Sequence, residues 1–481
     1  MLPTPNPDPA PTALCLPRAQ LDTLLHLALA RPAQPPHTLL AHAPLVLQPA
    51  PGGLQALAGP LSTQRLRALP PQPGHPPEPP PTHGLVLVAV ASPGAPPPQG
   101  DAACEAWLLQ HAPGFRLATA AINPALVLLW LRLDGQATLL FRHGRQPASA
   151  GAPRWVPVPQ LHLPGGGMQR VDLAATTGRQ PDPEPDANEP DPGPDDRRDS
   201  RHLAAFGAAP LRHLQRSHIV LVGAGRVGSV FAHGLVRLGV QRLTVIEPDH
   251  MEPHNEDGDV APLCEGRPKV EALQRFVRGL QRPGAVLDLQ PWPVSSARAG
   301  ALIAQADAVL VCVDNDAARL WANAWALAHN RCLLAVATRV QPQGAEADLR
   351  LLPAGSGCLA CVGGYVQRAE LLQQLALDGP VPTPADFRQQ RQGSLRSWSA
   401  LAAHLGQRLL EQHLLRPGGG ALFRQLQETP QGGLQVRDWR PEDDGRPRAC
   451  PFCSTLQGAG QAAVTPQRLR ALVRLWLDSA M

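Results

Sequence analysis

Two pairs of cysteines with the same internal spacing form the clearest chemical pattern in the sequence. Cys358-Leu-Ala-Cys361 and Cys450-Pro-Phe-Cys453 are separated by 88 residues. Two C-x-x-C knuckles can supply four thiolates to one tetrahedral zinc ion, whereas a redox C-x-x-C motif needs only one pair in a thioredoxin-like setting. The sequence therefore predicts a structural zinc site with four cysteine ligands in the C-terminal half of the chain.

A single lysine stands among many arginines. Lysine and arginine together number 43, and Lys269 is the only lysine. Arginine therefore fills nearly every position at which a general positive charge is sufficient. An ammonium group is a compact point charge, whereas a guanidinium group is a wide planar fork. We interpret Lys269 as a residue with a role that arginine cannot fill; the alternative is a chance survivor.

A glycine-rich segment lies upstream of this lysine. Gly223-Ala-Gly225-Arg226-Val-Gly228 directly follows an apolar run and precedes a predicted helix. Such a loop lets the backbone approach phosphates and presents helix N-terminal amides to anionic oxygens. Glu247 ends the next predicted strand, where a carboxylate can bond ribose hydroxyls. Taken alone, these features fit an NAD-dependent oxidoreductase at least as well as an ATP-binding protein.

Strands and helices alternate around this loop. The alternation predicts an α/β fold with a doubly wound, mostly parallel, Rossmann-like sheet. An amphipathic helix should follow Thr465-Pro466. The predicted strands are 218–222, 242–247, 285–289, 307–313 and 332–337, and the predicted helices run to 238 and over 268–277, 316–329 and 401–415.

Composition divides the chain into regions. Residues 1–12 are predicted to be disordered, residues 13–175 to form an accessory α/β domain, and residues 176–200 to be an acidic, proline-rich linker. The loop and the cysteines fall in 201–455, and a C-terminal helix falls in 456–481. In the accessory domain, the apolar runs 84–90 and 125–131 predict buried strands.

Composition also excludes some classes of protein. The net charge is +4 without a long basic run, so nucleic-acid binding has no support. No stretch reaches 18 apolar residues, so no membrane span is predicted, and the N-terminus lacks a signal-peptide pattern. We therefore expect a cytoplasmic protein, in which paired cysteines more often bind metal than form disulfides.

Five short segments in order resemble the ThiF/MoeB/HesA family, whose core is shared with ubiquitin-activating enzymes. The resemblance covers roughly residues 195–455. It implies that 201–455 form a ThiF-type adenylation domain that uses ATP, Mg²⁺ and Zn²⁺. The segments are the glycine-rich loop, Glu247-Pro-Asp249, His254-Asn255, Gly266-Arg-Pro-Lys269 and Val313-Asp314-Asn315.

The resemblance implies a role for each matching residue. Lys269 would contact the phosphates, and Asp314 would coordinate Mg²⁺, which bridges phosphate oxygens. Glu247 would hold the ribose. The rest of the nucleotide pocket would be formed by Gly223, Gly225, Arg226, Gly228, Asp249, Asn255 and Asn315. The alternative role for Asp314 is to cap the N-terminus of the helix that follows it.

Two further arginine positions bear on this resemblance. Arg201 resembles a family arginine that reaches the ATP of a partner subunit, which implies a homodimer; an ordinary charge at the edge of the linker is the alternative. The family usually has an arginine three residues after the asparagine, where this chain has Gly258. Arg226, inside the glycine-rich loop, is a candidate to replace that charge from the other side.

The implied reaction is attack of a carboxylate on the α-phosphate of ATP with release of pyrophosphate. The implied substrate is the C-terminal glycine of a ubiquitin-like protein ending in Gly-Gly, destined for a conjugating enzyme or a target. The fused N-terminal domain suggests a bacterial ubiquitin-like conjugation operon with a role in antiviral defence. The alternatives are a sulfur-carrier adenylyltransferase of the thiamine or molybdopterin type, a tRNA-modifying relative, an NAD-dependent oxidoreductase and a binding-only scaffold.

Conjugating relatives pass the adenylate to a cysteine in a loop after the first knuckle. Residues 362–449 contain no cysteine. Among the other thiols Cys264, in a predicted mobile loop, is the best candidate, although a small apolar residue is the more ordinary reading. A hydroxyl acceptor with His404 as base is the second option, and direct release of the adenylate is the third. The candidate hydroxyls are Ser394, Ser397 and Ser399.

Overall fold

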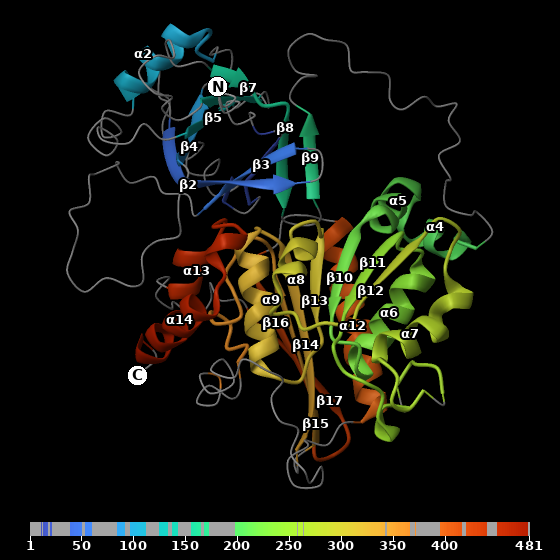
Figure 1. The fold of residues 1–481 in the computed structure, drawn as a ribbon. Helices are drawn as coiled ribbons and strands as arrows, with labels where there is room; N and C mark the ends of the chain where they lie inside the picture. Colours follow the sequence, from blue (N-terminus) through green and yellow to red (C-terminus); the bar gives the residue numbers. More distant parts are fainter. Residues whose placement is uncertain are drawn as a thin grey trace, which may run out of the picture. The chain divides into compact units, whose positions relative to one another are not determined.

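The chain divides into two compact units, described here one at a time (Figure 1). The first unit is built from residues 1–163, 168–189 and 454–463, and the second from 164–167, 190–453 and 464–481. The computed structural model describes residues 11, 13–17, 20–21, 39–50, 53–59, 84–91, 97–111, 125–132, 137–142, 155–164, 168–172, 198–256, 258–262, 264–341, 344–365, 371, 395–415, 420–439 and 450–479. None of the helices in these ranges is both long and apolar enough to span a bilayer.

The described part of the first unit is mainly a mixed nine-stranded sheet, to which helix α2 (Asp101–His111) is added. The accessory domain predicted as α/β is therefore chiefly β in the ranges described. The strand order is β7-β6-β5-β4-β2-β3-β1-β8-β9. The strands are β1 (Ala13–Cys15), β2 (Leu39–Ala50), β3 (Gly53–Ala58), β4 (Gly84–Ala91), β5 (Ala125–Arg132), β6 (Ala137–Arg142), β7 (Trp155–Pro157), β8 (Gln160–Pro164) and β9 (Met168–Asp172).

Both faces of β4 are covered, which explains its uninterrupted apolar sequence. Val86 and Val88 point into one hydrophobic cluster, and Leu87 and Ala89 point into a second cluster that includes Leu108 of α2. Successive strand residues alternate between faces, so a strand buried on both sides must be apolar throughout. The two apolar runs predicted as strands are β4 and β5.

The second unit contains an eight-stranded sheet of order β12-β11-β10-β13-β14-β15-β16-β17. The first five strands in this order are parallel, as predicted, and β14 to β17 pair antiparallel. The antiparallel extension was not predicted. The strands are β10 (His218–Val222), β11 (Arg242–Ile246), β12 (Val286–Gln290), β13 (Ala308–Val311), β14 (Cys332–Gln341), β15 (Gly344–Leu352), β16 (Leu422–Glu428) and β17 (Leu434–Trp439).

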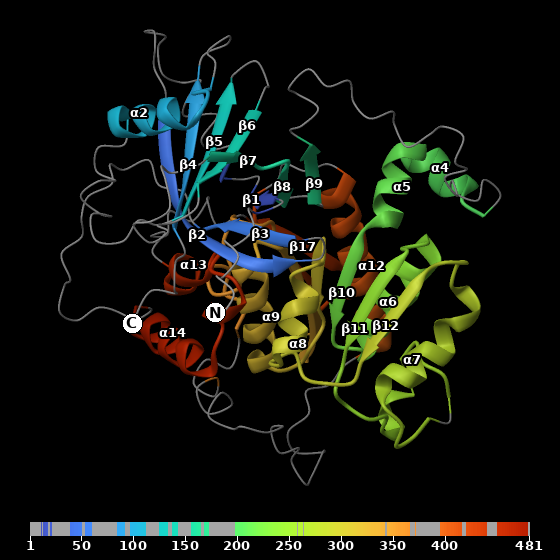
Figure 2. The same cartoon turned by 45° about the horizontal axis from the view of Figure 1, so that its top comes forward.

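Helices cover both faces of this sheet (Figures 1 and 2). Helices α5 (Ala208–Arg216), α6 (Arg226–Leu238), α7 (Lys269–Val277) and α12 (Arg396–Leu415) share one hydrophobic cluster with one side of the strands. Helices α8 (Ala297–Ile303) and α9 (Asp316–Ala328) lie on the other face. The second unit also contains α4 (Ser200–Phe206), α14 (Pro466–Ser479) and two single turns, η2 (Pro253–Asn255) and η3 (Arg278–Leu280). Helix α13 (Pro451–Leu456) crosses the boundary between the units at residue 454, and the single turn η5 (Gln461–Ala463) belongs to the first unit.

Helix α14 begins where the sequence predicts it. The Thr465 hydroxyl accepts a hydrogen bond from the backbone amide of Arg468, 3.2 Å away, as an N-terminal cap does. Its predicted apolar stripe is buried, so this face serves packing. The stripe consists of Leu469, Leu472, Val473 and Trp476.

A buried ion pair fixes the start of the second unit. Asp199 is fully buried, and its carboxylate accepts hydrogen bonds from both terminal nitrogens of Arg282 and from the side chain of Gln215. Gln215 also donates to the backbone carbonyl of Leu238 at 3.0 Å. The sequence places residues 198–200 in the linker, whereas the structure packs Asp199 firmly into the folded unit.

The substitution Asp199→Asn should lower the free energy of unfolding by about 3 kcal/mol at pH 7, because it leaves a largely buried guanidinium without its counter-charge. The Arg282 guanidinium holds the pKa of Asp199 below its usual value. The stabilisation is therefore complete above about pH 4 and is lost as the pH falls further. Denaturant titrations between pH 3 and 7 would measure it.

A matched control is the exposed pair between Arg424 and Asp438, which face each other across β16 and β17 at 2.6 and 2.7 Å. The substitution Asp438→Asn should cost less than about 1 kcal/mol, because solvent screens exposed pairs. Equal destabilisation by the two substitutions would contradict the importance assigned to Asp199.

Candidate functional site

The site lies at the carboxyl ends of β10 and β13. These neighbouring parallel strands are followed by α6 and α9, which run back on opposite faces of the sheet. Such a reversal of strand order leaves a crevice outside the strand ends, where open α/β sheets bind ligands. The glycine-rich loop follows β10, and Asp314 follows β13.

The three glycines of the loop are needed for different reasons. Gly223 has φ +97°, and an added Cβ would lie 2.8 Å from the carbonyl oxygen of Cys312. A Cβ at Gly228 would lie 1.9 Å from the carbonyl oxygen of Gly223, so the loop folds tightly onto α6. Around Gly225 there is open space instead. The loop thus turns at one glycine, packs at another and leaves room for a ligand at the third.

Glu247, the last residue before the turn after β11, is buried behind this loop. Its two carboxylate oxygens accept hydrogen bonds from the backbone amides of Ala224 at 2.8 Å and Asp249 at 3.0 Å. Burial raises the pKa of Glu247, against the opposing effects of Lys269 and the two amides. The structure therefore shows Glu247 holding the glycine-rich loop and the segment that carries Asp249.

Lys269, the first residue of α7, lies among three carboxylates. Its ammonium group donates to Asp249 at 2.9 Å, with 13% of the lysine side chain and 64% of the aspartate side chain exposed. Burial alone lowers the pKa of Lys269, but the charges of Glu247, Asp249 and Asp314 outweigh burial and raise it. The lysine therefore stays protonated at neutral pH.

Backbone hydrogen bonds hold Lys269 in this place. The amide of Lys269 donates to the carbonyl of Asp249 at 2.9 Å, that of Met251 to Arg267 at 2.7 Å, and that of Gly266 to Met251 at 2.8 Å. The segments 249–251 and 266–269 thus form a short ladder. The ladder places the lysine at the site independently of its side-chain ion pair.

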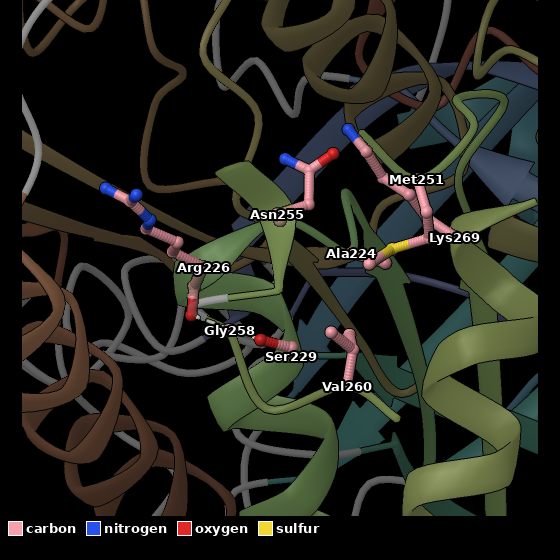
Figure 3. A pocket seen from close by; sticks show the side chains of 9 residues that line it. Ala224, Arg226, Ser229, Met251, Asn255, Gly258, Val260 and Lys269 are labelled. Atoms are coloured by element: carbon pink, nitrogen blue, oxygen red, sulfur yellow. Dashed lines mark hydrogen bonds between the residues drawn. The ribbon is translucent and has the colours of Figure 1, made fainter. Parts of the chain in front are cut away.

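Together these segments form a small pocket (Figure 3). Arg226 lies on one side, Lys269 and Met251 lie on the other, and Asn255 stands between them. The Asn255 side chain accepts from the amide of Glu252 at 3.0 Å and so caps the turn η2. The full lining is Ala224, Gly225, Arg226, Ser229, Met251, Asn255, Gly258, Val260 and Lys269.

Two neighbouring residues that follow β13 have different roles. Asn315 is the N-cap of α9, and its side-chain oxygen accepts from the amide of Ala318 at 2.7 Å. The alternative reading of Asp314 as the cap is therefore wrong. Asp314 is exposed at the rim of the crevice, close enough to raise the pKa of Lys269. Its carboxylate is available to a ligand, while Asn315 shapes the helix start.

Sequence reasoning missed a buried pair on α9. Arg319 donates to Asp316 at 2.8 Å and to the carbonyl of Val313 at 3.0 Å, and both side chains are buried. One turn after Arg319 on the same helix, the side chain of Asn323 accepts from the amide of Leu359 at 3.1 Å. Helix α9 therefore connects the backbone beside Asp314 to the first cysteine knuckle. Only the i, i+3 spacing of the pair is visible in the sequence.

The four knuckle cysteines meet in space. Their sulfur atoms all lie within 4.8 Å of one another, although 88 residues separate the two pairs. The measured Sγ–Sγ distances are 3.8 Å for Cys358–Cys361, 3.6 Å for Cys358–Cys450 and 3.6 Å for Cys361–Cys453. A tetrahedron with metal–sulfur bonds of about 2.3 Å has sulfurs about 3.8 Å apart. The cluster is therefore compatible with zinc.

The candidate acceptors for a covalent intermediate are poorly placed. Cys264 was expected in a mobile loop, but it is 1% exposed and belongs to the hydrophobic core. Ser399 is also buried, while Ser397 and His404 are exposed on the same helix, α12, two turns apart. A rise of about 1.5 Å per residue separates these two by about 10 Å, so His404 cannot serve Ser397 as a base. Ser394 lies outside the described residues.

The structure also places the residues of the two arginine predictions. Arg201 is exposed on α4. A Cβ at Gly258 would lie 4.0 Å from the Cα of Arg226 and 3.2 Å from the hydroxyl of Ser229, so position 258 lies against the base of Arg226, on the same side of the pocket (Figure 3). The Arg226 guanidinium lies 3.5 Å from the carbonyl of His254.

Comparison with known proteins agrees with this arrangement. The ThiF family model matches residues 199–392, which contain β10 to β15, the glycine-rich loop, Lys269, Asp314 and the first knuckle. Residues 199–392 are a ThiF-family domain. The resemblance noted from five short segments is thereby confirmed for this part of the chain.

Curated proteins similar to the ThiF-family domain include adenylyltransferases and activating enzymes. "Adenylyltransferase and sulfurtransferase UBA4" of Candida albicans is 29% identical over 140 residues, which are 29% of this chain and 30% of that protein. "SAMP-activating enzyme E1" of Haloferax volcanii is 31% identical over 128 residues, 26% of this chain and 47% of that protein. The match spans less than half of each such relative.

Solved structures offer a more distant likeness. A crystal structure of E. coli MccB with ATP aligns over 53% of this chain and 73% of that chain, with 14% identity and a TM-score of 0.42. A likeness at this level is too weak to inform the fold or the function of the ThiF-family domain.

The purified protein should contain about one zinc ion per chain. The substitutions Cys358→Ser and Cys450→Ser should each remove the metal and destabilise the second unit, because metal binding at such a site contributes directly to folding. Elemental analysis and thermal unfolding would measure both effects. As a control, Cys264→Ala, at a buried cysteine outside the knuckles, should keep its zinc. Metal-free wild-type protein, purified without chelators, would contradict the assignment.

Proposed function

We propose that this protein adenylates a carboxylate with ATP, and that its substrate is the C-terminal glycine of a ubiquitin-like or sulfur-carrier protein. The observation that carries the proposal is the placement of Lys269. The only lysine of the chain is fixed by a backbone ladder beside the glycine-rich loop, and three carboxylates keep it charged. A site built around an ammonium group and a phosphate-binding loop suits a nucleoside triphosphate.

The glycine-rich loop and α6 supply the phosphate cradle. Helix α6 begins directly after Gly225, where an added Cβ would meet open space, and the helix dipole favours negative charge at this end. Lys269 approaches from the opposite side of the pocket. In the reaction, the substrate carboxylate attacks the α-phosphorus and the bond to the departing pyrophosphate breaks. Lys269 would stabilise the charge that develops on the phosphate oxygens.

Two exposed carboxylates fit a magnesium ion. Asp249, which pairs with Lys269 of the pocket lining, and Asp314, which lies close enough to act on the charge of Lys269, both carry hard oxygen donors; Mg²⁺ is usually bound by one or two carboxylates together with substrate phosphates. When bound, the ion would neutralise phosphate charge that repels the incoming carboxylate. Lys269 itself pairs with Asp249 at 2.9 Å.

Arg226 is proposed to supply the charge that Gly258 lacks. The two positions lie against each other, with the added Cβ of residue 258 only 4.0 Å from the Cα of Arg226. A guanidinium group rooted at the first residue of α6 can therefore reach part of the space that an arginine at position 258 would occupy. Arg201, exposed on α4, is proposed to reach the site of a second copy in a homodimer.

The relatives support the substrate class but not a single substrate. One relative is an adenylyltransferase and sulfurtransferase, and another is a SAMP-activating enzyme. A sulfur-carrier adenylyltransferase is therefore the second candidate. We also propose delivery to a conjugating enzyme, an antiviral role and a cytoplasmic location. An NAD-dependent oxidoreductase would leave Lys269 and the cysteine cluster without a role.

The substitution Lys269→Ala should abolish carrier-dependent exchange of pyrophosphate into ATP while the fold is retained. Lys269→Arg should lower exchange by about 100-fold or more, because the wider fork misplaces the charge against the phosphates. A matched control is Arg267→Ala, which removes an exposed cation two residues away that pairs with Glu271. Exchange near the wild-type rate in either Lys269 variant would refute the proposal.

No thiol-labile adduct between the enzyme and its carrier is expected on Cys264. The thiol is buried, so attack on an adenylate in the pocket would require local unfolding. Incubation with ATP and the carrier, followed by denaturing gels with and without reducing agent, would detect an adduct. An adduct that is lost in Cys264→Ser would show that the thiol is reached. A hydroxide-labile, thiol-resistant adduct would indicate a serine instead.

A further inference from the structure

Behind one wall of the pocket, three polar side chains converge on Asp259. This residue follows Gly258, which lines the pocket, and its side chain is 13% exposed. One carboxylate oxygen lies 3.0 Å from Nδ1 of His233, and the other accepts from Arg396 at 3.0 Å. The backbone amide of Asp259 donates to the hydroxyl of Ser229 at 3.1 Å. We call these four residues the Asp259 network.

The hydrogen bonds fix the tautomer of His233. Arg237 donates through Nε to Nε2 of His233 at 3.0 Å, and a guanidinium group has no acceptor. Nε2 must therefore be the unprotonated nitrogen, so Nδ1 carries the proton and donates to Asp259. The edge of the Phe276 ring packs on the imidazole, with ring centroids 5.3 Å apart. His233 is thus held in one orientation, and it holds Asp259.

Ser229 connects the network to the phosphate cradle. It is fully buried in the first turn of α6, and its hydroxyl donates to the carbonyl of Arg226 at 3.3 Å while accepting from Asp259. The space above it is tight, since a Cβ at Gly258 would lie 3.2 Å from the hydroxyl. The pocket wall at 258–260 therefore rests directly on the helix start that faces the ligand space.

Arg396 connects the same wall to α12, 137 residues further along the chain. It is the first residue of α12, which packs closely against α6. A Cβ at Gly406 would lie 2.6 Å from the Phe231 ring, and one at Gly234 would lie 2.2 Å from the side chain of Gln407. Because the two helices touch at glycines, their relative position is well defined, and Asp259 joins both of them to the wall.

We propose that Asp259 is a positioning residue for the nucleotide, clamping the pocket wall 258–260 between the start of α6 and the start of α12. The proposal rests on the proposed use of ATP. Its effect should fall on nucleotide binding rather than on the chemical step. Lys269 and Asp249 are anchored separately by the ladder of 249–251 with 266–269, so they keep their places when the clamp is lost.

The test is a double-mutant cycle in carrier-dependent pyrophosphate exchange by the full-length protein. Asp259→Ala should raise KM for ATP about 10-fold and leave kcat within about 2-fold. Arg396→Ala should raise KM about 3-fold, because its side chain is 58% exposed and the pair is screened. The double variant should have a KM for ATP no higher than that of Asp259→Ala alone, because both substitutions remove the same ion pair. Arg408→Ala, on the same helix but paired with Glu411, should change neither parameter.

Amide hydrogen exchange of the nucleotide-free protein gives a readout that needs no activity. Exchange at residues 258–262 should become faster in Asp259→Ala and remain unchanged in Arg408→Ala. If the wild-type protein shows no pyrophosphate exchange, the proposed function fails while hydrogen exchange still tests the clamp. Loss of kcat without a change in KM, multiplicative effects of Asp259→Ala and Arg396→Ala, or unchanged hydrogen exchange at 258–262 would each overturn the proposal.

Discussion

The carboxylate of Glu247 is the interaction on which the candidate site depends most. One of its oxygens holds the amide of Ala224 in the glycine-rich loop, and the other holds the amide of Asp249, whose side chain meets Lys269. A buried carboxylate is costly unless donors and opposite charge surround it. Two amides and a nearby ammonium group meet that need. The same contacts that make the burial of Glu247 tolerable also set the separation of the loop and the lysine.

Helices that begin beside the pocket connect it to the other parts of the site. Helix α9 starts beside Asp314, carries the buried pair of Arg319 and Asp316, and accepts a hydrogen bond from the first knuckle through the side chain of Asn323. The cysteine cluster therefore supports the strand end that carries Asp314, although it lies outside the pocket. A metal in the cluster would stabilise this connection without taking part in the chemistry, because the knuckles bring the two distant chain segments 358–361 and 450–453 together.

Local pattern allowed much of this to be predicted, and long-range pairing explains what it missed. Strand β10 is an apolar run that ends at the glycine-rich loop, and α7 begins shortly after Gly266. The predicted bounds of β10 and the predicted start of α7 agree with the structure to within a residue. Strand β15 escaped prediction because one of its faces carries buried charges. Glu346, Asp348 and Arg350 are each 7–8% exposed and are satisfied by partners on neighbouring strands or loops. A polar sequence with such partners cannot be distinguished from a loop by hydropathy alone. The ion pair of Asp199 and Arg282 also escaped prediction, because its partners lie 83 residues apart in the sequence.

The charges of the pocket lead to a further consequence for its ligand. The carboxylates of Glu247, Asp249 and Asp314 surround the ammonium group of Lys269, and the remaining cation of the lining, Arg226, lies on the far side. The carboxylates of Asp249 and Asp314 therefore place negative charge beside the lysine, where phosphates are proposed to bind. Such a site repels a bare polyanion, since like charges in a partly desolvated crevice are screened poorly. A divalent cation held by Asp314 would offset this repulsion by supplying positive charge. We therefore expect the acidic residues that keep the lysine protonated also to make binding of the proposed nucleotide depend on a divalent cation.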